Sequence, residues 1–373
     1  CSYFDSIPTL HITGNVASFR QSDEFGVRQY GFQETDIVSM AKPITKYVVR
    51  IKTAEDIITE LPKALEIAKS GRPGPVLIDI PDDFQRANIN IKSSDITKIS
   101  RKVKMPSCFV DFSNLVRSIN QAKRPIIILG AGILNSGSKN SVIELLEKIG
   151  IPYLYTWPLK GIQDSNARLN LGSFGTHSLR GNNIVLQNSD FILSIGTRLD
   201  SRATAKLDTF ARSAKIAMID IDRAEMDKFS KLNKNIDFKY ELSCDVFIEQ
   251  FEQCINKTPI NEIERKWADY INRVRYKFNT IPKLELSNIN PYYAAKSIAK
   301  KLNIGDTITV DTGTCLPLTM VYGEEKARQK YISSYNNTPM GYALPAAIGA
   351  HFATGKPITC INGDGGLQMN IQE

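Results

Sequence analysis

Short apolar runs that end next to glycine or aspartate restrict the fold of this sequence more than any other feature. They are four to six residues long and occupy 75–80, 125–129, 152–155, 191–195, 215–220, 307–311 and 358–361. Runs of this length with few polar interruptions predict strands that are buried on both faces, as in a parallel sheet. Helical patterns between them, such as 54–69 and 141–149, supply the crossovers that parallel strands need. The pattern therefore predicts an α/β fold with parallel sheets.

Composition divides the 373 residues into three α/β blocks. The blocks cover 1–92, 111–255 and 290–373. The stretch 93–110 is rich in Lys and Ser and predicts a linker, and 256–289, which holds a charged helical pattern, predicts a second one. A chain of this length exceeds one ordinary domain, so we expect three parallel-sheet domains.

The net charge of +8 comes from 47 basic and 39 acidic residues. An anionic partner is one interpretation. The basic residues are spread among acidic ones without a nucleic-acid motif, so we favour a basic solvated surface and expect no nucleic-acid partner. No apolar run reaches the roughly 18 residues of a membrane span, and we expect no membrane association.

Cysteine and histidine usage argues against a disulfide framework and a zinc site. The six cysteines show no CxxC spacing, and the chain has three histidines. Unpaired thiols in a chain of this size are typical of a reducing cytoplasm.

The sequence Gly363-Asp364-Gly365-Gly366 follows the apolar run 358–361 almost directly. Glycines at the carboxyl end of a parallel strand let backbone amides approach phosphate oxygens, and a carboxylate can hold Mg²⁺ bound to a diphosphate. An aspartate between glycines is also common in plain turns. The motif alone leaves both interpretations open, although its position predicts a loop.

Neighbouring segments give this motif a family context. Met340-Gly341-Tyr342-Ala343 precedes it and Leu367-Gln368-Met369-Asn370 follows it, and together they resemble the diphosphate-binding domain of thiamine-diphosphate-dependent enzymes. Arg72-Pro73-Gly74-Pro75 with the run behind it resembles the last strand of the pyrimidine-binding domain. Other segments are similar to the acetolactate synthase large-subunit branch; they are 12–16, 31–38, 171–177, 196–204 and 219–225.

The resemblance implies thiamine diphosphate and Mg²⁺ as cofactors. It makes Asp364 a metal ligand and Met340 the apolar residue that props the cofactor. The further cofactor contacts that it implies in this block are Gly341, Gly363, Gly365 and Gly366. Phe32 and Gln33 become catalytic residues near the substrate, and Arg198 a bidentate donor to the carboxylate of the second 2-ketoacid.

The middle block resembles a flavin domain, in which glycines admit a dinucleotide and acidic residues after a strand bind ribose hydroxyls. The implied flavin contacts are Lys42, Gly130, Gly132, Gly175, His177, Arg202, Asp220 and Asp222. Some positions depart from the pattern: Lys42 replaces an arginine, and Thr176-His177-Ser178 replaces Met-His-Gly. Gly313-Thr314-Cys315-Leu316 replaces a Gly-Gln-His-Gln stretch that touches the diphosphate. FAD is therefore left open as a third cofactor.

The implied reaction decarboxylates pyruvate and adds the product to a second 2-ketoacid, as in branched-chain amino-acid synthesis. A homodimer or tetramer in the cytoplasm, or in a plastid or mitochondrion of a eukaryote, is expected, and a small regulatory subunit is left open. Two alternatives remain. One is a related thiamine-diphosphate decarboxylase or carboligase of a surface-polysaccharide or other ketoacid pathway, and the other is a non-catalytic nucleotide-binding module.

The resemblance also places two required groups outside the sequence. The catalytic glutamate is expected before Cys1, and the second metal ligand, an asparagine, after Glu373. We therefore expect a chain truncated at both ends, inactive by itself. Asn15 stands where acetolactate synthases usually carry glutamine.

Overall fold

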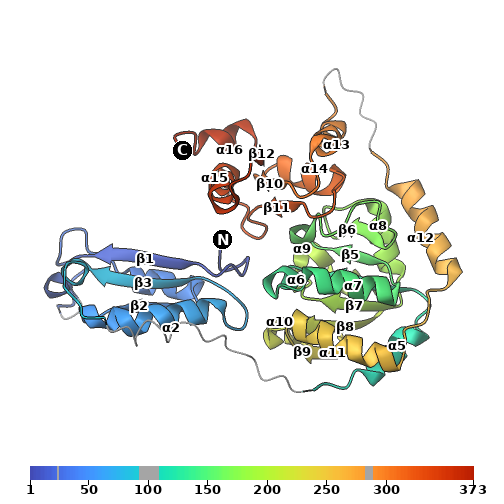
Figure 1. The fold of residues 1–373 in the computed structure, drawn as a ribbon, viewed down its shortest axis with the longest axis horizontal. Helices are drawn as coiled ribbons and strands as arrows, with labels where there is room; N and C mark the ends of the chain where they lie inside the picture. The colour runs from blue at the N-terminus through green and yellow to red at the C-terminus, as the bar shows by residue number, and fades with distance from the viewer. Residues whose placement is uncertain (23–24, 92–108, 282–288) are drawn as a thin grey trace. The chain divides into compact units, whose positions relative to one another are not determined.

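The computed structural model describes residues 1–22, 25–91, 109–281 and 289–373, so most of the linker predicted at 93–110 lies outside the described residues (Figure 1). The chain divides into two compact units, residues 1–107 and 108–373. The second unit contains two sheets, and the first contains one.

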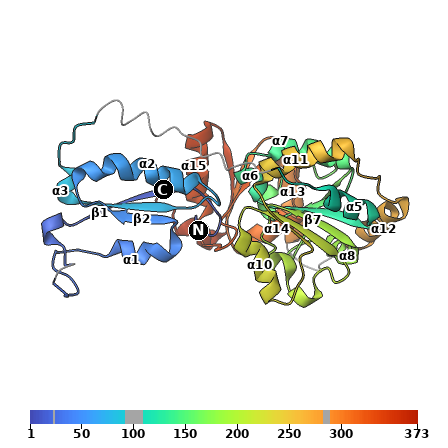
Figure 2. The same ribbon diagram turned by 90° about the horizontal axis from the view of Figure 1, so that it is seen from below.

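The first unit is built on a parallel sheet of three strands in the order β1-β3-β2. The strands are β1 (Leu10–Asn15), β2 (Tyr47–Arg50) and β3 (Val76–Pro81). Its helices are α1 (Ile37–Ala41), α2 (Ile57–Lys69) and α3 (Asp82–Gln85). Helix α2 buries Ala64 and Ala68 against Val76 and Ile78 of the central strand, while α1 covers the opposite face (Figure 2).

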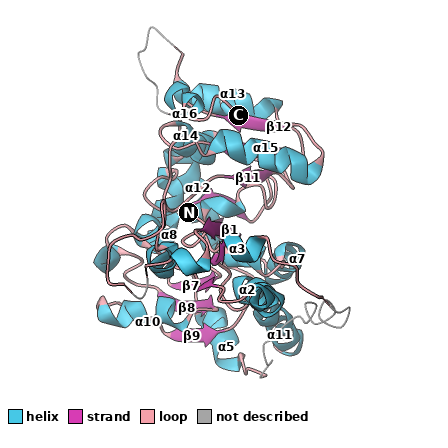
Figure 3. Cartoon of the chain, turned by 90° about the vertical axis from the view of Figure 1, so that its left-hand side faces the viewer, coloured by secondary structure: helices cyan, strands magenta, loops and turns pink. Residues whose placement is uncertain are grey.

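The middle sheet has six strands in the order β6-β5-β4-β7-β8-β9, and every neighbouring pair is parallel. The strands are β4 (Pro125–Leu129), β5 (Tyr153–Tyr155), β6 (Asn170–Ser173), β7 (Phe191–Ile195), β8 (Lys215–Asp220) and β9 (Phe238–Glu241). Figure 3 shows β7, β8 and β9 stacked in this order. The order reverses between β4 and β7, which is the switch point where such sheets bind ligands.

Two hydrophobic cores cover the two faces of this sheet. Ile127 and Leu129 join one core, and Ile126 and Ile128 join the other, because successive strand residues face opposite sides. The first core is closed by α5 (Ser113–Gln121), α6 (Gly132–Asn135), α7 (Lys139–Ile149) and α11 (Cys244–Lys257). The second is closed by α8 (Arg180–Asn188), α10 (Arg223–Lys231) and α12 (Arg265–Phe278). Figure 2 shows α7 and α11 on one face and α8 and α10 on the other.

Helix α12 is part of the second core. Trp267 is 2% exposed, and its Nε1–H donates to the Pro125 carbonyl oxygen at 3.1 Å. After the last turn, Asn279 accepts a hydrogen bond from the Gly181 amide at 2.8 Å and donates one to Asn182 Oδ1 at 2.9 Å. The helix therefore caps and covers α8.

The third sheet has three parallel strands in the order β11-β10-β12. They are β10 (Thr307–Val310), β11 (Lys330–Ile332) and β12 (Ile358–Ile361). The helices around it are α13 (Pro291–Lys301), α14 (Cys315–Tyr322), α15 (Ala343–Thr354) and α16 (Asp364–Gln368). The Asn290 side chain caps α13 by accepting the Tyr292 amide at 3.0 Å.

One local expectation at the end of the sequence was wrong. Gly363-Asp364-Gly365-Gly366 is not a loop, since Asp364 begins α16 and the Leu367 amide donates to the Gly363 carbonyl at 2.9 Å. Residues 369–372 form turns. Extended backbone at Gly363 allows the chain to turn into the helix immediately after β12.

The predicted α/β fold with parallel sheets is confirmed, whereas the three domain boundaries remain predictions. Helix α9 (Ser201–Thr204) and single 3-10 turns complete the structure; the turns are Ser18–Arg20, Lys42–Ile44, Ala54–Asp56, Trp157–Leu159 and Leu207–Thr209. Within the described ranges, no helix combines the length and apolarity required to cross a membrane, and the five cysteines there are unpaired.

Candidate cofactor site

The structure brings Met340 and Gly341 together with the glycines of α16. The Met340 Cε atom lies 3.6 Å from the position that a Cβ atom on Gly365 would take, and Met340 is 56% exposed. Gly341 has a φ of 81°, and a Cβ atom there would lie 3.4 Å from the Gly366 carbonyl oxygen. Four of the six residues predicted to bind cofactor or metal in this block therefore form one cluster.

The other two, Gly363 and Asp364, lie on an open side of the same turn. A Cβ atom on Gly363 would meet nothing within 4 Å, and the Asp364 side chain is exposed in the first turn of α16. Next to them, both amide atoms of Asn362 are buried without a hydrogen-bond partner. An open glycine face, an accessible carboxylate and an unpartnered amide fit a diphosphate held through a divalent cation.

The predicted flavin glycines Gly130 and Gly132 lie where β4 and β7 end side by side. A Cβ atom on Gly130 would lie 2.3 Å from the Gly196 carbonyl oxygen, so the close approach of two backbones requires glycine there. Their amides already donate within the protein, Gly130 to the Ile195 carbonyl and Gly132 to the Gly196 carbonyl, each at 2.9 Å. These glycines are therefore explained by strand-end packing.

Asp220 lies in the same region, at the end of β8. Its carboxylate accepts the Asp222 amide at 2.9 Å, and Asp222 in turn caps α10 by accepting the Ala224 amide at 3.0 Å. Burial, with a smaller contribution from Asp220, raises the pKa of the neighbouring Cys244 thiol to about 12. Cys244 is therefore a protonated core thiol at neutral pH.

Gly175, His177 and Arg202 form a second cluster around Trp157. The Arg202 guanidinium lies 3.8 Å from the Trp157 ring centre, and Arg202 Nη1 donates to the Tyr335 carbonyl at 2.9 Å. The His177 ring lies 6.1 Å from the Trp157 ring, and a Cβ atom on Gly175 would lie 2.6 Å from the Arg202 carbonyl oxygen.

Arg198 is held by polar groups from both sheets of the second unit. Its Nη2 atom donates to Asn336 Oδ1 at 2.6 Å and to Asp200 Oδ2 at 3.3 Å. Glu225 Oε1 lies 3.9 Å from Arg198 Nη1, and the Arg198 side chain is 28% exposed. Arg198 and Arg202 thus contact consecutive residues, Asn336 and Tyr335, of the segment that leads to Met340.

Phe32, Gln33 and Lys42 belong to the first unit. Phe32 is 85% exposed, Gln33 has a φ of 68°, and Lys42 is exposed in a 3-10 turn. Glu34 holds this loop by accepting the Ser22 amide at 2.6 Å and the Tyr30 amide at 2.9 Å. Desolvation is the largest single effect and raises the pKa of Glu34, but the hydrogen bonds from Ser22, Tyr30 and Gly31 together lower it to about 2.

Comparison with protein families gives one match in each of the two sheet regions of the second unit. Residues 112–238 match the central domain of thiamine pyrophosphate enzymes, and residues 311–373 match their C-terminal TPP binding domain. The chain belongs to the thiamine pyrophosphate enzyme family. The C-terminal match begins at Asp311 and contains Met340 and the Gly363–Gly366 turn.

The chain is also similar to individual proteins within this family. The chain is 34% identical to the acetolactate synthase isozyme 1 large subunit of Escherichia coli over 99% of its length. It is 33% identical to a probable acetolactate synthase large subunit of Methanococcus aeolicus over 100%, and 31% identical to the chloroplastic acetolactate synthase 2 of Nicotiana tabacum over 99%. It spans 63%, 63% and 55% of these three relatives.

Some residues that organise this thiamine pyrophosphate enzyme were missed by sequence reasoning. Asp79 in β3 is fully buried and accepts hydrogen bonds from Thr13 Oγ1 at 2.9 Å, Asn15 Nδ2 at 2.9 Å and Arg50 Nε at 2.8 Å. Asn15 also donates to the Thr35 carbonyl at 3.0 Å, so it connects Asp79 to the loop that carries Phe32. The signal that the sequence offered for this role is the aspartate Asp79 inside the apolar run 75–80.

A buried ion pair joins the middle and third sheets of the enzyme. Lys160 Nζ lies 3.0 Å from Glu325 Oε2, and Glu325 Oε1 accepts the Tyr155 hydroxyl at 2.6 Å. Burial alone would raise the pKa of Glu325, but the Lys160 charge and the Tyr155 hydroxyl lower it below its usual value. Glu325 therefore stays ionised at neutral pH.

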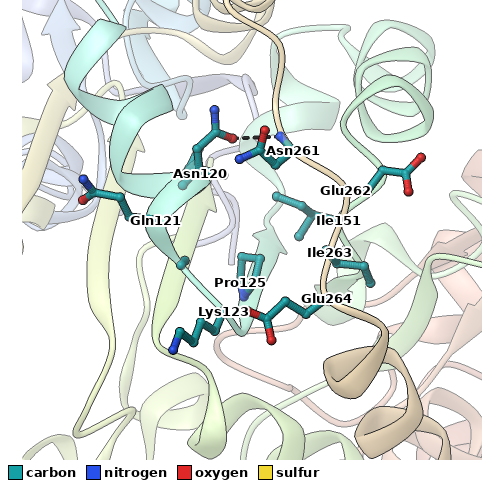
Figure 4. A pocket seen from close by; sticks show the side chains of 11 residues that line it. Asn120, Gln121, Lys123, Pro125, Ile151, Asn261, Glu262, Ile263 and Glu264 are labelled. Carbon is teal, nitrogen blue, oxygen red and sulfur yellow. Dashed lines mark hydrogen bonds between the residues drawn. The ribbon is translucent and has the colours of Figure 1, made fainter.

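A small cavity of about 230 Å³ lies far from these residues in the sheet topology (Figure 4). Lys123, Pro125 and Ile151 line it at the amino ends of β4 and β5, together with Asn261 and Glu264 from the segment before α12. The predicted site residues of the middle sheet lie at the opposite, carboxyl ends of these strands. Among the described residues, no group of three or more His, Cys, Asp or Glu side chains forms a metal cluster.

Proposed function

We propose that this chain is part of a thiamine-diphosphate-dependent enzyme that decarboxylates pyruvate and condenses the product with a second 2-ketoacid, as acetolactate synthases do. The observation that carries the proposal is the cluster of Met340, Gly341 and the Gly363–Gly366 turn within the matched TPP binding domain. The names of the relatives support the choice of reaction.

Mg²⁺ and the diphosphate would be held at the open side of that cluster. Asp364 would supply one carboxylate oxygen to the metal, and the glycines would allow close approach of the phosphate oxygens. Met340 would pack against the cofactor with its exposed, flexible apolar side chain. Bound thiamine diphosphate supplies the electron sink for decarboxylation, while the protein positions and shields the reacting carbon.

Substrate contacts are proposed separately for Phe32 and Gln33 of the first unit and for Arg198 of the second. The exposed Phe32 side chain offers an apolar wall, and Arg198 keeps part of its guanidinium accessible for a carboxylate. Asn336 would hold that guanidinium in place through its 2.6 Å contact. We expect 2-ketoacids as substrates on this basis.

FAD stays an open part of the proposal. Gly175, His177 and Arg202 lie together at one edge of the middle sheet, which supports a binding region. Arg202 is stacked on Trp157, and the amides of Gly130 and Gly132 are engaged in the protein, which weighs against direct contacts from these groups. Flavin absorbance of the purified protein, before and after adding FAD, tests this part separately.

Self-association is proposed from exposed apolar side chains at both predicted substrate and cofactor positions. Phe32 is 85% and Met340 56% exposed. A homodimer or tetramer would cover them. The relatives from Escherichia coli and Methanococcus aeolicus are named large subunits, so we keep a small regulatory subunit as a partner to test, and expect the enzyme in the cytoplasm or in a plastid or mitochondrion.

The decisive experiment assays the full-length protein for acetolactate from pyruvate with thiamine diphosphate, Mg²⁺ and FAD. Acetolactate formation supports the proposal, and its absence with bound thiamine diphosphate favours the second candidate, a carboligase or decarboxylase for another ketoacid. Asn15 and the Gly313-Thr314-Cys315 sequence favour that candidate, because they depart from the usual acetolactate synthase residues. A protein that binds a nucleotide and ignores thiamine diphosphate would instead be a nucleotide-binding module.

A further inference from the structure

Asp311 is a buried carboxylate that the proposed function does not use. It directly follows β10, is 1% exposed, and its own amide donates to the Ile361 carbonyl at the end of β12 at 2.9 Å. It therefore lies where the central strand β10 and its edge neighbour β12 end. A buried carboxylate without hydrogen-bond partners would cost several kcal/mol, so the groups that contact it are informative.

Three backbone amides supply those contacts. Oδ1 accepts the Thr312 amide at 2.8 Å and the Gly341 amide at 3.2 Å, while Oδ2 accepts the Ala343 amide at 3.0 Å. Two of the three amides belong to the segment that carries Met340. In the described part of the chain, the charge of Asp311 is thus met by backbone N–H groups.

The same carboxylate also contacts the Gly363–Gly366 turn. A Cβ atom on Gly366 would lie 3.1 Å from Asp311 Oδ1 and 2.5 Å from Asn362 Oδ1, so only glycine fits between these two side chains. On the other side, Asn370 Nδ2 donates to the Gly341 carbonyl at 2.7 Å. Both halves of the cofactor cluster therefore meet at Asp311.

We propose that Asp311 is the positioning residue that fixes the Met340–Ala343 segment against the Gly363–Gly366 turn, so that both present one preformed surface to thiamine diphosphate. The inference rests on the proposed function for the identity of the ligand. A carboxylate is required because it offers two acceptor oxygens to three donors, whereas an asparagine would turn its NH₂ group toward one of the amides. Preorganisation of this kind lowers the ordering cost of binding.

The test compares Asp311→Asn with Asp306→Asn in the full-length protein. Asp306 precedes the same strand and also accepts a backbone amide, that of Asn303 at 2.6 Å, but at the end remote from the cluster. We measure hydrogen exchange at Gly341 and Ala343 without cofactor, then the Kd for thiamine diphosphate with Mg²⁺ by calorimetry. For Asp311→Asn we expect faster exchange at the Gly341 and Ala343 amides. The Kd for thiamine diphosphate should rise about tenfold, the equivalent of one strong contact. The kcat at saturating cofactor should change much less. Asp306→Asn should change neither reading.

Each outcome has one meaning. Parental exchange and Kd in a folded Asp311→Asn variant overturn the positioning role. A parent protein that binds no thiamine diphosphate overturns the proposed function, while the exchange at Gly341 and Ala343 still reports on Asp311. If Asp311→Asn does not fold, Gly366→Ala displaces the same carboxylate without removing it, and unchanged exchange in that variant overturns the role.

Discussion

Lys160 Nζ and Glu325 Oε2 lie 3.0 Å apart in an ion pair whose side chains are 1% and 6% exposed. Lys160 Nζ also donates a hydrogen bond to the Gly323 carbonyl oxygen at 2.6 Å. Both of these contacts are with residues that directly follow α14 in the third sheet's part of the chain. The pair connects the turn after β5 with the residues after α14.

Removing Lys160 should therefore be costly. Lys160→Met leaves Glu325 buried and charged without its cation, for which we expect a loss of about 3–5 kcal/mol in the free energy of unfolding. Urea unfolding measures it. Lys148→Met removes one member of an exposed pair with Glu252, 40% and 44% exposed, and should cost less than about 1 kcal/mol. Equal losses in the two variants would refute the importance of the buried pair.

Gly130→Ala should destabilise the protein by about 1–3 kcal/mol, because the new Cβ atom has no space beside Gly196. The neighbouring backbone lies 2.3 Å from its position. The matched control is Gly349→Ala in α15, where a Cβ atom meets nothing within 4 Å. Since alanine favours the helix, this control should gain up to about 1 kcal/mol. Thermal unfolding of both variants shows whether packing, rather than loss of glycine, is responsible.

Asp364→Ala should weaken the binding of thiamine diphosphate with Mg²⁺ by at least about tenfold, because one metal ligand is lost. Calorimetry of the full-length protein gives the Kd. Asp269→Ala, an exposed aspartate on α12, is the control and should bind as the parent does. Chelation of Mg²⁺ should abolish the difference between parent and Asp364→Ala, and a difference that persists would contradict a metal role.

The loop that carries Phe32 should loosen in acid because of Glu34. Its pKa is lowered to about 2 in the folded protein, against an ordinary value of 4.5. A lowered folded pKa means that the stabilising contribution is complete above pH 4.5 and disappears as the pH falls toward 2. The protection of the Tyr30 and Gly31 amides, the ratio of the intrinsic to the observed hydrogen-exchange rate at each pH, should fall over this range in the parent. In Glu34→Gln this protection should be low at neutral pH already, whereas the exposed Glu66→Gln should follow the parent.

Much of the fold could be predicted because the central strands are continuous apolar runs. The predicted limits of 125–129, 191–195, 215–220 and 358–361 agree with β4, β7, β8 and β12. The strands β2, β6, β9 and β11 were missed, and all four lie at sheet edges. An edge strand has one neighbour and needs no continuous apolar run, so its sequence carries a weak signal.

The candidate site was predictable where it depends on local sequence. The strand-end glycines and the Met340-Gly341 segment were assigned from their resemblance to thiamine-diphosphate-dependent enzymes, and the structure brings Met340, Gly341, Gly365 and Gly366 together. The role of Asp311 was not predictable, because its partners Gly341 and Ala343 lie 30 and 32 positions away. The partner of Lys160 is 165 positions away, and such contacts follow only from the order of the strands.

The packing of α12 determines which residues an expressed fragment of the middle sheet must include. Trp267, Ile271 and Val274 are 2%, 3% and 6% exposed because they fill the core beneath α8. An expressed piece that stops after α11 would leave this apolar surface uncovered and would aggregate, although all six strands would be present. A piece that extends through Asn279 keeps both the core and the cap on α8, and should be the smallest middle-domain protein suitable for crystallisation or flavin titration.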